Sequence, residues 1–165
     1  MVAITRRLVE DVRGQRETDM IAEAERWFKE MVAPCIAPRA RARIDEHRAR
    51  GHTVALLTAS TPYVSAPVAR DLGLGNDYIC TRLEVVDGVF TGRCIEPVCY
   101  GPGKVYWARA FAEARGLDLA QSYFYTDSFT DLAMLEAVGH PVVVNPDTRL
   151  RRTAQRRGWP SERFF

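Results

Sequence analysis

From residue 53 onward, short apolar segments alternate with helical segments, and this alternation restricts the fold more than any other feature of the sequence. The segments TVALLT, SYFYT and PVVV are short and rich in β-branched or aromatic residues, and each precedes a segment with apolar residues at helical spacing. Such runs are typical of strands that are buried on both faces of a parallel sheet. The alternation therefore predicts an α/β protein with a Rossmann-like, three-layer parallel sheet between helices.

The segment before this alternation shows only helical patterns. Ile4, Leu8 and Val12 recur at helical spacing, and a second set of apolar residues extends from Ile21 to Met31. A further helix is expected from about Pro38 until Gly51. We therefore expect a partial helical cap over residues 1–36 and an α/β core over residues 37–165.

Asp87 and Gly88 stand between two alternating runs, YICTRLEVV and VFTGRCI. An Asp-Gly pair in this setting is a strong hairpin signal because both turn residues must adopt positive φ. The sequence predicts a β-hairpin insertion before the helix that begins at GPGK.

Composition narrows the classes of function. The net charge is +2, which gives no general attraction to nucleic acids or membranes, and no apolar run approaches the roughly 20 residues of a membrane span. The five arginines of RLRRTAQRR are interpreted as a solvated helix face. The four cysteines form no CxxC pair, which argues against zinc and favours free thiols in the cytoplasm. His47, His52 and His140 are expected to be isolated from one another and to have no catalytic role.

Three polar features are predicted at the carboxyl ends of strands, where parallel sheets bind ligands. Thr58 and Ala59 end the first strand ahead of a helix, and their hydroxyl and N–H groups could hold an anion. A strand-end threonine with a nearby helix cap explains the same pattern without a ligand.

Lys104 follows Gly101-Pro102-Gly103 at a helix start, where the helix dipole disfavours a cation unless an anion binds there. A surface lysine that turns toward solvent is the alternative, and the sequence lacks the pattern of a Walker loop.

Asp127 and Asp131 follow the strand SYFYT, and their spacing places both carboxylates on one face. They could ligate a hard cation such as Mg²⁺, which takes one or two protein carboxylates, waters and a substrate phosphate. A turn followed by a helix cap is the structural alternative. A bound phosphate needs hydrogen-bond donors, which Thr58, Ala59 and Lys104 could supply. The metal that accompanies it needs carboxylates, which Asp127 and Asp131 could supply, so the three features together predict one phosphate site.

These segments resemble the haloacid dehalogenase (HAD) superfamily of phosphohydrolases, in particular its phosphoserine-phosphatase-like subfamily IB. VALLTAS is similar to the second motif of the family, GPGKV to the third, and YTDSFTDLAMLEAVGHPVVVNPD to the fourth. The resemblance implies Mg²⁺-dependent hydrolysis of a small phosphorylated metabolite. It implies phosphate contacts at Thr58, Ala59 and Lys104, metal ligation by Asp127, and a supporting catalytic role for Asp131 with Lys104.

The first motif of the family, DxDx[TSV], is absent from these 165 residues. In the family its first aspartate is the nucleophile, and its strand lies between those that end here at Thr58 and Thr126. We therefore expect a truncated or inactive form of a phosphatase; the alternative is a non-catalytic protein that binds phosphate or a phosphometabolite. A missing N-terminal segment, an oligomer, or direct pairing of the two strands would fill the gap. Tyr125-Thr126 and Thr130 also depart from the family pattern, in which Gly and Asn are common.

Overall fold

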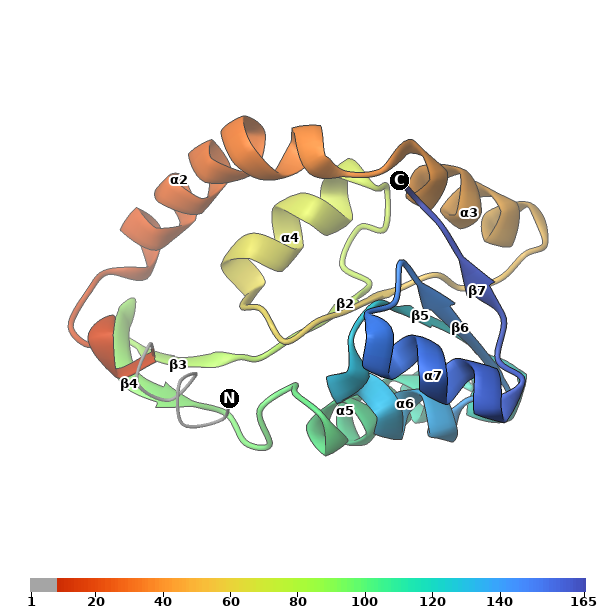
Figure 1. Cartoon of the computed structure of the whole chain (residues 1–165). Coiled ribbons are helices and arrows are strands. Elements are labelled where there is room, and N and C mark those ends of the chain that lie inside the picture. Colours follow the sequence, from red (N-terminus) through yellow and green to blue (C-terminus); the bar gives the residue numbers. More distant parts are fainter. Residues whose placement is uncertain (1–8) are drawn as a thin grey trace. The chain divides into compact units, whose positions relative to one another are not determined.

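The structure is a computed structural model that describes residues 9–165, and the chain forms two compact units (Figure 1). The first unit combines the chain up to Ile36 with Arg43–Cys99, and the second combines Ala37–Ala42 with Tyr100–Phe165. The expected division into a cap over residues 1–36 and a core over residues 37–165 stays a prediction. Parallel strands that alternate with helices occur in both units, so the predicted α/β fold class is confirmed.

The helices of the first unit surround a small apolar core. Helix α2 (Glu17–Trp27) continues into a π-helical turn (Phe28–Val32) and a 3-10 turn (Ala33–Cys35), and it packs against α4 (Pro62–Asp71) (Figure 1). Ala24, Tyr63 and Phe90 form the core cluster, in which the Tyr63 and Phe90 rings meet edge to face at 5.4 Å. The predicted helix around Ile4, Leu8 and Val12 falls largely on residues 1–8, outside the described residues.

Tyr63 also carries a polar contact at the edge of this core. Its hydroxyl donates a hydrogen bond to Glu17 Oε1 at 2.8 Å. Burial and this hydrogen bond raise the pKa of Tyr63 well above its ordinary value. The phenol therefore stays protonated and holds the start of α2 against α4.

Two short sheets belong to the first unit. Strand β1 (Leu56–Leu57) pairs in parallel with β2 (Tyr78–Ile79), so the regular part of TVALLT is shorter than predicted. Strands β3 (Leu83–Val86) and β4 (Val89–Cys94) form the predicted hairpin. Asp87 and Gly88 have φ values of 51° and 75°, as the turn requires.

The second unit is built on a three-stranded parallel sheet in the order β5 (Tyr123–Thr126), β6 (His140–Val144) and β7 (Ser161–Glu162). Figure 1 shows α5 (Pro102–Arg115), α6 (Leu132–Ala137) and α7 (Thr148–Arg157) beside this sheet. Thr126 is in register with Val143, so the loops after β5 and β6 leave the same edge of the sheet. That edge carries the candidate site.

Close packing fixes the second unit. Val143, Leu135 and Leu150 are almost completely buried between the sheet and its helices. Gly139 lies so close to the backbone of Ala120 that a Cβ at Gly139 would be 1.7 Å from the Ala120 carbonyl oxygen. Gly139 N also donates to Leu119 O at 2.9 Å, which holds the loop before β6 against the turn before β5.

Helix α3 (Pro38–Ala49) confirms the helix expected from Pro38, but the structure corrects the prediction that the histidines are isolated. His47 Nδ1 lies 2.9 Å from His52 Nδ1, and His47 is buried. The reason is that α3 ends at Ala49, and the turn after it brings His52 back onto the last turn of the helix, where His52 N donates to His47 O.

The remaining predictions concern strand pairing, cysteines and membranes. Among residues 9–165, β1 pairs with β2 and β5 pairs with β6, so neither sheet contains both strands that flank the expected gap. Cys35, Cys80, Cys94 and Cys99 are all free thiols, as predicted. No helix within the described part of the chain combines the length and apolar character that a membrane span requires.

Candidate functional site

The loop GPGK places Lys104 in the first turn of α5. Gly101 precedes the helix with a φ of 53°, which a side chain would strain, and Pro102 occupies the first helical position, where its fixed φ suits the start. A Cβ on Gly101 would also lie 3.8 Å from Thr130 O, so this loop runs close to the loop after β5. Lys104 is 7% exposed, so it does not turn toward solvent.

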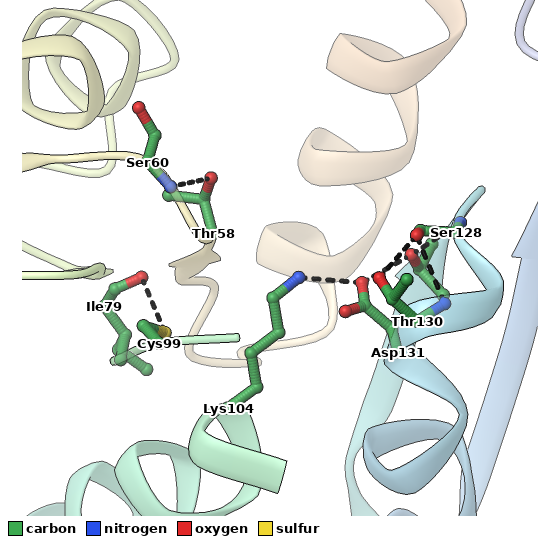
Figure 2. Close-up of polar contacts among 9 residues, drawn as sticks. Thr58, Ser60, Ile79, Cys99, Lys104, Ser128, Thr130 and Asp131 are labelled. Carbon is green, nitrogen blue, oxygen red and sulfur yellow. Dashed lines mark hydrogen bonds and ion pairs between the residues drawn. The ribbon is translucent and has the colours of Figure 1, made fainter. Parts of the chain in front are cut away.

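The buried ammonium group of Lys104 forms an ion pair with Asp131. Figure 2 shows Lys104 directed at the Asp131 carboxylate, and Nζ lies 2.7 Å from Oδ2. Asp131 is only 3% exposed. Burial of one such charge without the other would be strongly unfavourable, so each group requires its partner. The pair explains how a lysine is tolerated near the positive end of α5.

One carboxylate oxygen of Asp131 accepts both of its side-chain hydrogen bonds within residues 9–165. Oδ2 accepts from Lys104 Nζ and from Thr126 Oγ1, the latter at 2.8 Å. Oδ1 is buried and has no hydrogen-bond partner among the described residues. A buried carboxylate oxygen without a partner is unfavourable unless a ligand or water satisfies it.

The loop between β5 and α6 is held by hydroxyl groups. Thr126 Oγ1 accepts from Ser128 N at 3.1 Å while it donates to Asp131. Ser128 Oγ accepts from Thr130 N at 3.3 Å and lies 2.7 Å from Thr130 Oγ1 (Figure 2). Asp127 lies within this loop, and its exposed carboxylate has no hydrogen bond or ion pair among residues 9–165. Of the two predicted carboxylates, one is therefore solvated and the other is buried against a lysine.

Thr58 and Ala59 lie in the first unit, directly after β1. Thr58 Oγ1 accepts a hydrogen bond from Ser60 N at 3.1 Å (Figure 2), and this leaves the hydroxyl hydrogen for an acceptor. Ala59 O accepts from the buried hydroxyl of Thr81 at 3.1 Å, and the same oxygen of Thr81 accepts from Cys99 N. These contacts fix the loop after β1 relative to β2. That this loop and Lys104 serve one anion stays a prediction.

A comparison with protein families identifies the chain. The haloacid dehalogenase-like hydrolase family matches residues 3–136. The chain belongs to this family. The matched residues include Lys104, Asp127 and Asp131, in the segments that resemble the third and fourth motifs.

Similar proteins include two curated phosphatases and a solved structure. "Phosphoserine phosphatase SerB1" of Mycobacterium tuberculosis is 38% identical over 154 residues, which are 93% of this chain and 49% of that protein. "Histidinol-phosphatase" of Neisseria meningitidis is 34% identical over 149 residues, with coverage of 87% and 67%. A crystal structure of a protein of unknown function from Bordetella pertussis superposes with a TM-score of 0.90 at 33% identity, with coverage of 97% and 73%. The chain spans about half the length of most of the curated relatives it matches.

The carboxylates of this HAD protein fit magnesium. Asp131 Oδ1 and the carboxylate of Asp127, neither of which has a hydrogen-bond partner among residues 9–165, are hard oxygen donors in one loop. Within residues 9–165 there is no group of three or more His, Cys, Asp or Glu side chains that could hold a metal. A small number of protein carboxylates suits Mg²⁺, which keeps waters and shares a substrate phosphate, whereas zinc needs three or four protein ligands.

A hollow lies at the other end of the sheet. A cavity of about 510 Å³ is lined by Tyr123 and His140, at the amino ends of β5 and β6, and by Trp159, which precedes β7. No predicted site residue lines it. Because open parallel sheets bind ligands at the carboxyl ends of their strands, the site is assigned to the Lys104 and Asp131 edge.

Sequence reasoning missed Thr126, Ser128 and Thr81. Thr126 was noted only as a departure from the family pattern, yet its hydroxyl links Ser128 N to Asp131. Its place at the end of a strand was the one available signal, because strand-end hydroxyls often bond into the following loop. Thr81 gave no such signal, since its contacts to Ala59 and Cys99 depend on a fold that brings three loops together.

Proposed function

We propose that the chain carries the phosphate site of a Mg²⁺-dependent hydrolase, similar to phosphoserine phosphatases, that acts on a small phosphorylated metabolite. The observation that carries this proposal is the buried Lys104–Asp131 pair, in which Asp131 Oδ1 has no partner among the described residues, in the same loop as the exposed Asp127. The names of the relatives support the class of substrate, because both phosphoserine and histidinol phosphate are small phosphomonoesters.

Each residue has a distinct role in this proposal. Thr58 and the N–H of Ala59 donate to phosphate oxygens, and the ammonium of Lys104 offsets their negative charge. Asp131 pairs with Lys104 and fixes it in place, and Thr126 orients Asp131. Asp127 and Asp131 would hold Mg²⁺, which when bound offsets charge on the transferred phosphoryl group.

These 165 residues by themselves are proposed to be an inactive form. They contain no DxDx[TSV] sequence, so the aspartate that attacks phosphorus in the family has no counterpart within them. The nucleophile would come from a segment outside residues 1–165. We also propose a cytoplasmic location, because four free thiols are typical of a reducing compartment.

Calorimetry with the purified chain tests the binding site. Inorganic phosphate is expected to bind in the presence of Mg²⁺, and Asp127→Asn is expected to weaken this binding by about tenfold or more, the loss of one charged ligand. Asp11→Asn, which removes an exposed carboxylate in the other unit, is the matched control and should leave the affinity unchanged. Absence of phosphate binding to the wild-type chain would refute the proposal.

Turnover assays test the inactive form. The chain alone should release no measurable phosphate from an aryl phosphate. Mg²⁺-dependent release that Asp127→Asn abolishes would contradict inactivity while leaving the hydrolase class intact.

The second candidate function is a non-catalytic protein that binds phosphate or a phosphometabolite. It is favoured by the buried Lys104–Asp131 pair together with the absence of the DxDx[TSV] motif from these 165 residues. A peptide with an apolar strand that ends in DxDx[TSV] separates the two functions. A hydrolase should gain Mg²⁺-dependent turnover when the peptide is added or fused, whereas a binding protein should bind phosphate without turnover in either form.

A further inference from the structure

Arg149 is held over the loop that carries both aspartates. Its guanidinium carbon lies 3.6 Å from the centroid of the Phe129 ring. Phe129 begins the 3-10 turn Phe129–Asp131, which ends at the residue that binds Lys104. Because the loops after β5 and β6 leave the same edge of the sheet, this stacking places Arg149 at the edge that carries the proposed phosphate site.

The guanidinium of Arg149 is positioned but has no polar partner. Among the described residues no carboxylate, carbonyl or hydroxyl group accepts a hydrogen bond from it. Asp147, the nearest carboxylate in the sequence, caps α7 by accepting from Leu150 N at 2.7 Å. Stacking on Phe129 holds the planar group through one face and leaves the N–H groups at its edge available to donate. The spacing of these groups matches the two oxygens of a carboxylate.

The location of Arg149 within α7 also favours a bound anion beside its guanidinium group. It occupies the first turn of the helix, which contains no acidic residue and where the dipole disfavours a cation. Other arginines of α7 are satisfied within the protein: Arg151 donates to Pro146 O, Arg156 donates to Thr153 Oγ1, and Arg157 pairs with Glu136. Arg152 is exposed and, within the described residues, has neither a polar partner nor a ring beneath it.

We propose that Arg149 is a specificity-determining residue that binds a carboxylate on the substrate, next to its phosphate. This inference rests on the proposed phosphate site and selects among its substrates. The names of two relatives refer to substrates that differ in this feature, since phosphoserine has a carboxylate and histidinol phosphate has none. Arg149 favours a substrate that carries a carboxylate, as phosphoserine does.

Two ligands that differ only in the carboxylate test the proposal. O-phosphoserine and O-phosphoethanolamine share the phosphate and the ammonium group, and their affinities for the chain are measured by calorimetry with Mg²⁺. The wild-type chain is expected to bind O-phosphoserine about tenfold more tightly, the contribution of one charge-assisted bidentate contact. Arg149→Met should abolish this ratio, and Arg152→Met, the matched control on the same helix, should preserve it.

The affinity for inorganic phosphate shows whether Arg149 selects for a carboxylate on the ligand or maintains the structure of the phosphate site. Arg149→Met should leave that affinity unchanged, and Arg149→Lys, which keeps the charge without the planar fork, should retain only part of the ratio. Equal affinity of the wild-type chain for both ligands, a ratio that survives in Arg149→Met, or loss of inorganic phosphate binding in both Arg149 variants would overturn the assignment of Arg149 alone. Failure of both ligands and of phosphate to bind the wild-type chain would overturn the proposed phosphate site as well.

Discussion

Lys104 is buried in the first turn of a helix, where desolvation and the helix dipole both oppose a positive charge. Asp131 compensates for both effects, yet it is itself buried, and its Oδ1 has no partner in the described part of the chain. Each of the two groups therefore holds the other in place at a cost in stability. Such an arrangement is typical of a binding site, where a ligand completes the contacts that the folded protein leaves open.

Separate removal of the two charges should show this dependence. Lys104→Met and Asp131→Asn are each expected to lower the free energy of unfolding by about 3–5 kcal/mol, because each leaves a buried charge without its partner. The double variant should lose less than the sum of the two by about 1–3 kcal/mol. Urea unfolding measures all four proteins, and strictly additive losses would show that the two groups do not depend on each other.

Gly139 is required for space rather than for backbone conformation. A Cβ there would lie 1.7 Å from Ala120 O, so Gly139→Ala must displace backbone and should lower the free energy of unfolding by about 3 kcal/mol or more. Gly116 provides the control: it has a φ of 64° but nothing within 4 Å of its Cβ position, and Gly116→Ala should cost about 1 kcal/mol. Thermal unfolding ranks the two variants, and a larger loss for Gly116→Ala would contradict this explanation.

At the scale of elements, His47 near the end of α3 should make the free energy of unfolding depend on pH. Burial, followed by the nearby charges of His52, Arg43 and Arg50, lowers the pKa of His47 below 6.5, and Glu46 opposes the shift only weakly. The folded chain therefore binds fewer protons than the unfolded chain once the pH falls below about 6.5. Stability should be unaffected above this pH and should decline as the pH falls from 6.5 through the lowered pKa of the folded state.

Unfolding in urea at a series of pH values from 7.5 to 5 measures this decline. His47→Gln should make the dependence on pH shallower over this range. His140→Gln is the control, because His140 is exposed and stacks on Tyr123 in the other unit. An unchanged slope in His47→Gln would assign the pH dependence to other groups.

The elements with strong local signals were predictable. Pro62 and Pro102 at the first helical positions indicated the starts of α4 and α5, because proline fixes φ. The Asp87-Gly88 turn indicated the start of β4, because this pair tolerates the positive φ that a tight hairpin turn requires. Strand lengths were less predictable. TVALLT reads as six residues of strand, yet only Leu56 and Leu57 pair with a neighbour, since pairing depends on the partner and not on propensity. Strand β7 has a polar sequence, Ser161–Glu162, and gave no signal of its own.

The candidate site was predictable to a similar degree. Position at a strand end or helix start singled out Thr58, Lys104, Asp127 and Asp131, because backbone geometry concentrates unpaired N–H groups and charge there. Burial was not predictable: Asp127 and Asp131 look alike in sequence, yet only Asp131 lies beneath the loop against Lys104. The link through Thr126 and the stacking of Arg149 on Phe129 required the three-dimensional contacts.

At the scale of the whole molecule, Thr58 in one unit and Lys104 in the other are expected to bind the same anion. The sequence predicts that they do, because both follow the pattern of a phosphate site at the carboxyl edge of a parallel sheet. A ligand that contacts both units stabilises both, since its binding free energy adds to the stability of every segment that must stay folded to bind it.

Hydrogen exchange with and without Mg²⁺ and phosphate tests this prediction. Protection should rise in the loop after β1 and in the first turn of α5 together. Thr58→Ala and Lys104→Met should each weaken phosphate binding, and their effects should be non-additive because the two groups contact one ligand. Thr53→Ala, which removes an exposed hydroxyl five residues before Thr58, is the control and should change neither quantity. Protection confined to the α5 segment, with an unchanged affinity in Thr58→Ala, would restrict the site to the second unit and exclude the loop after β1 from it.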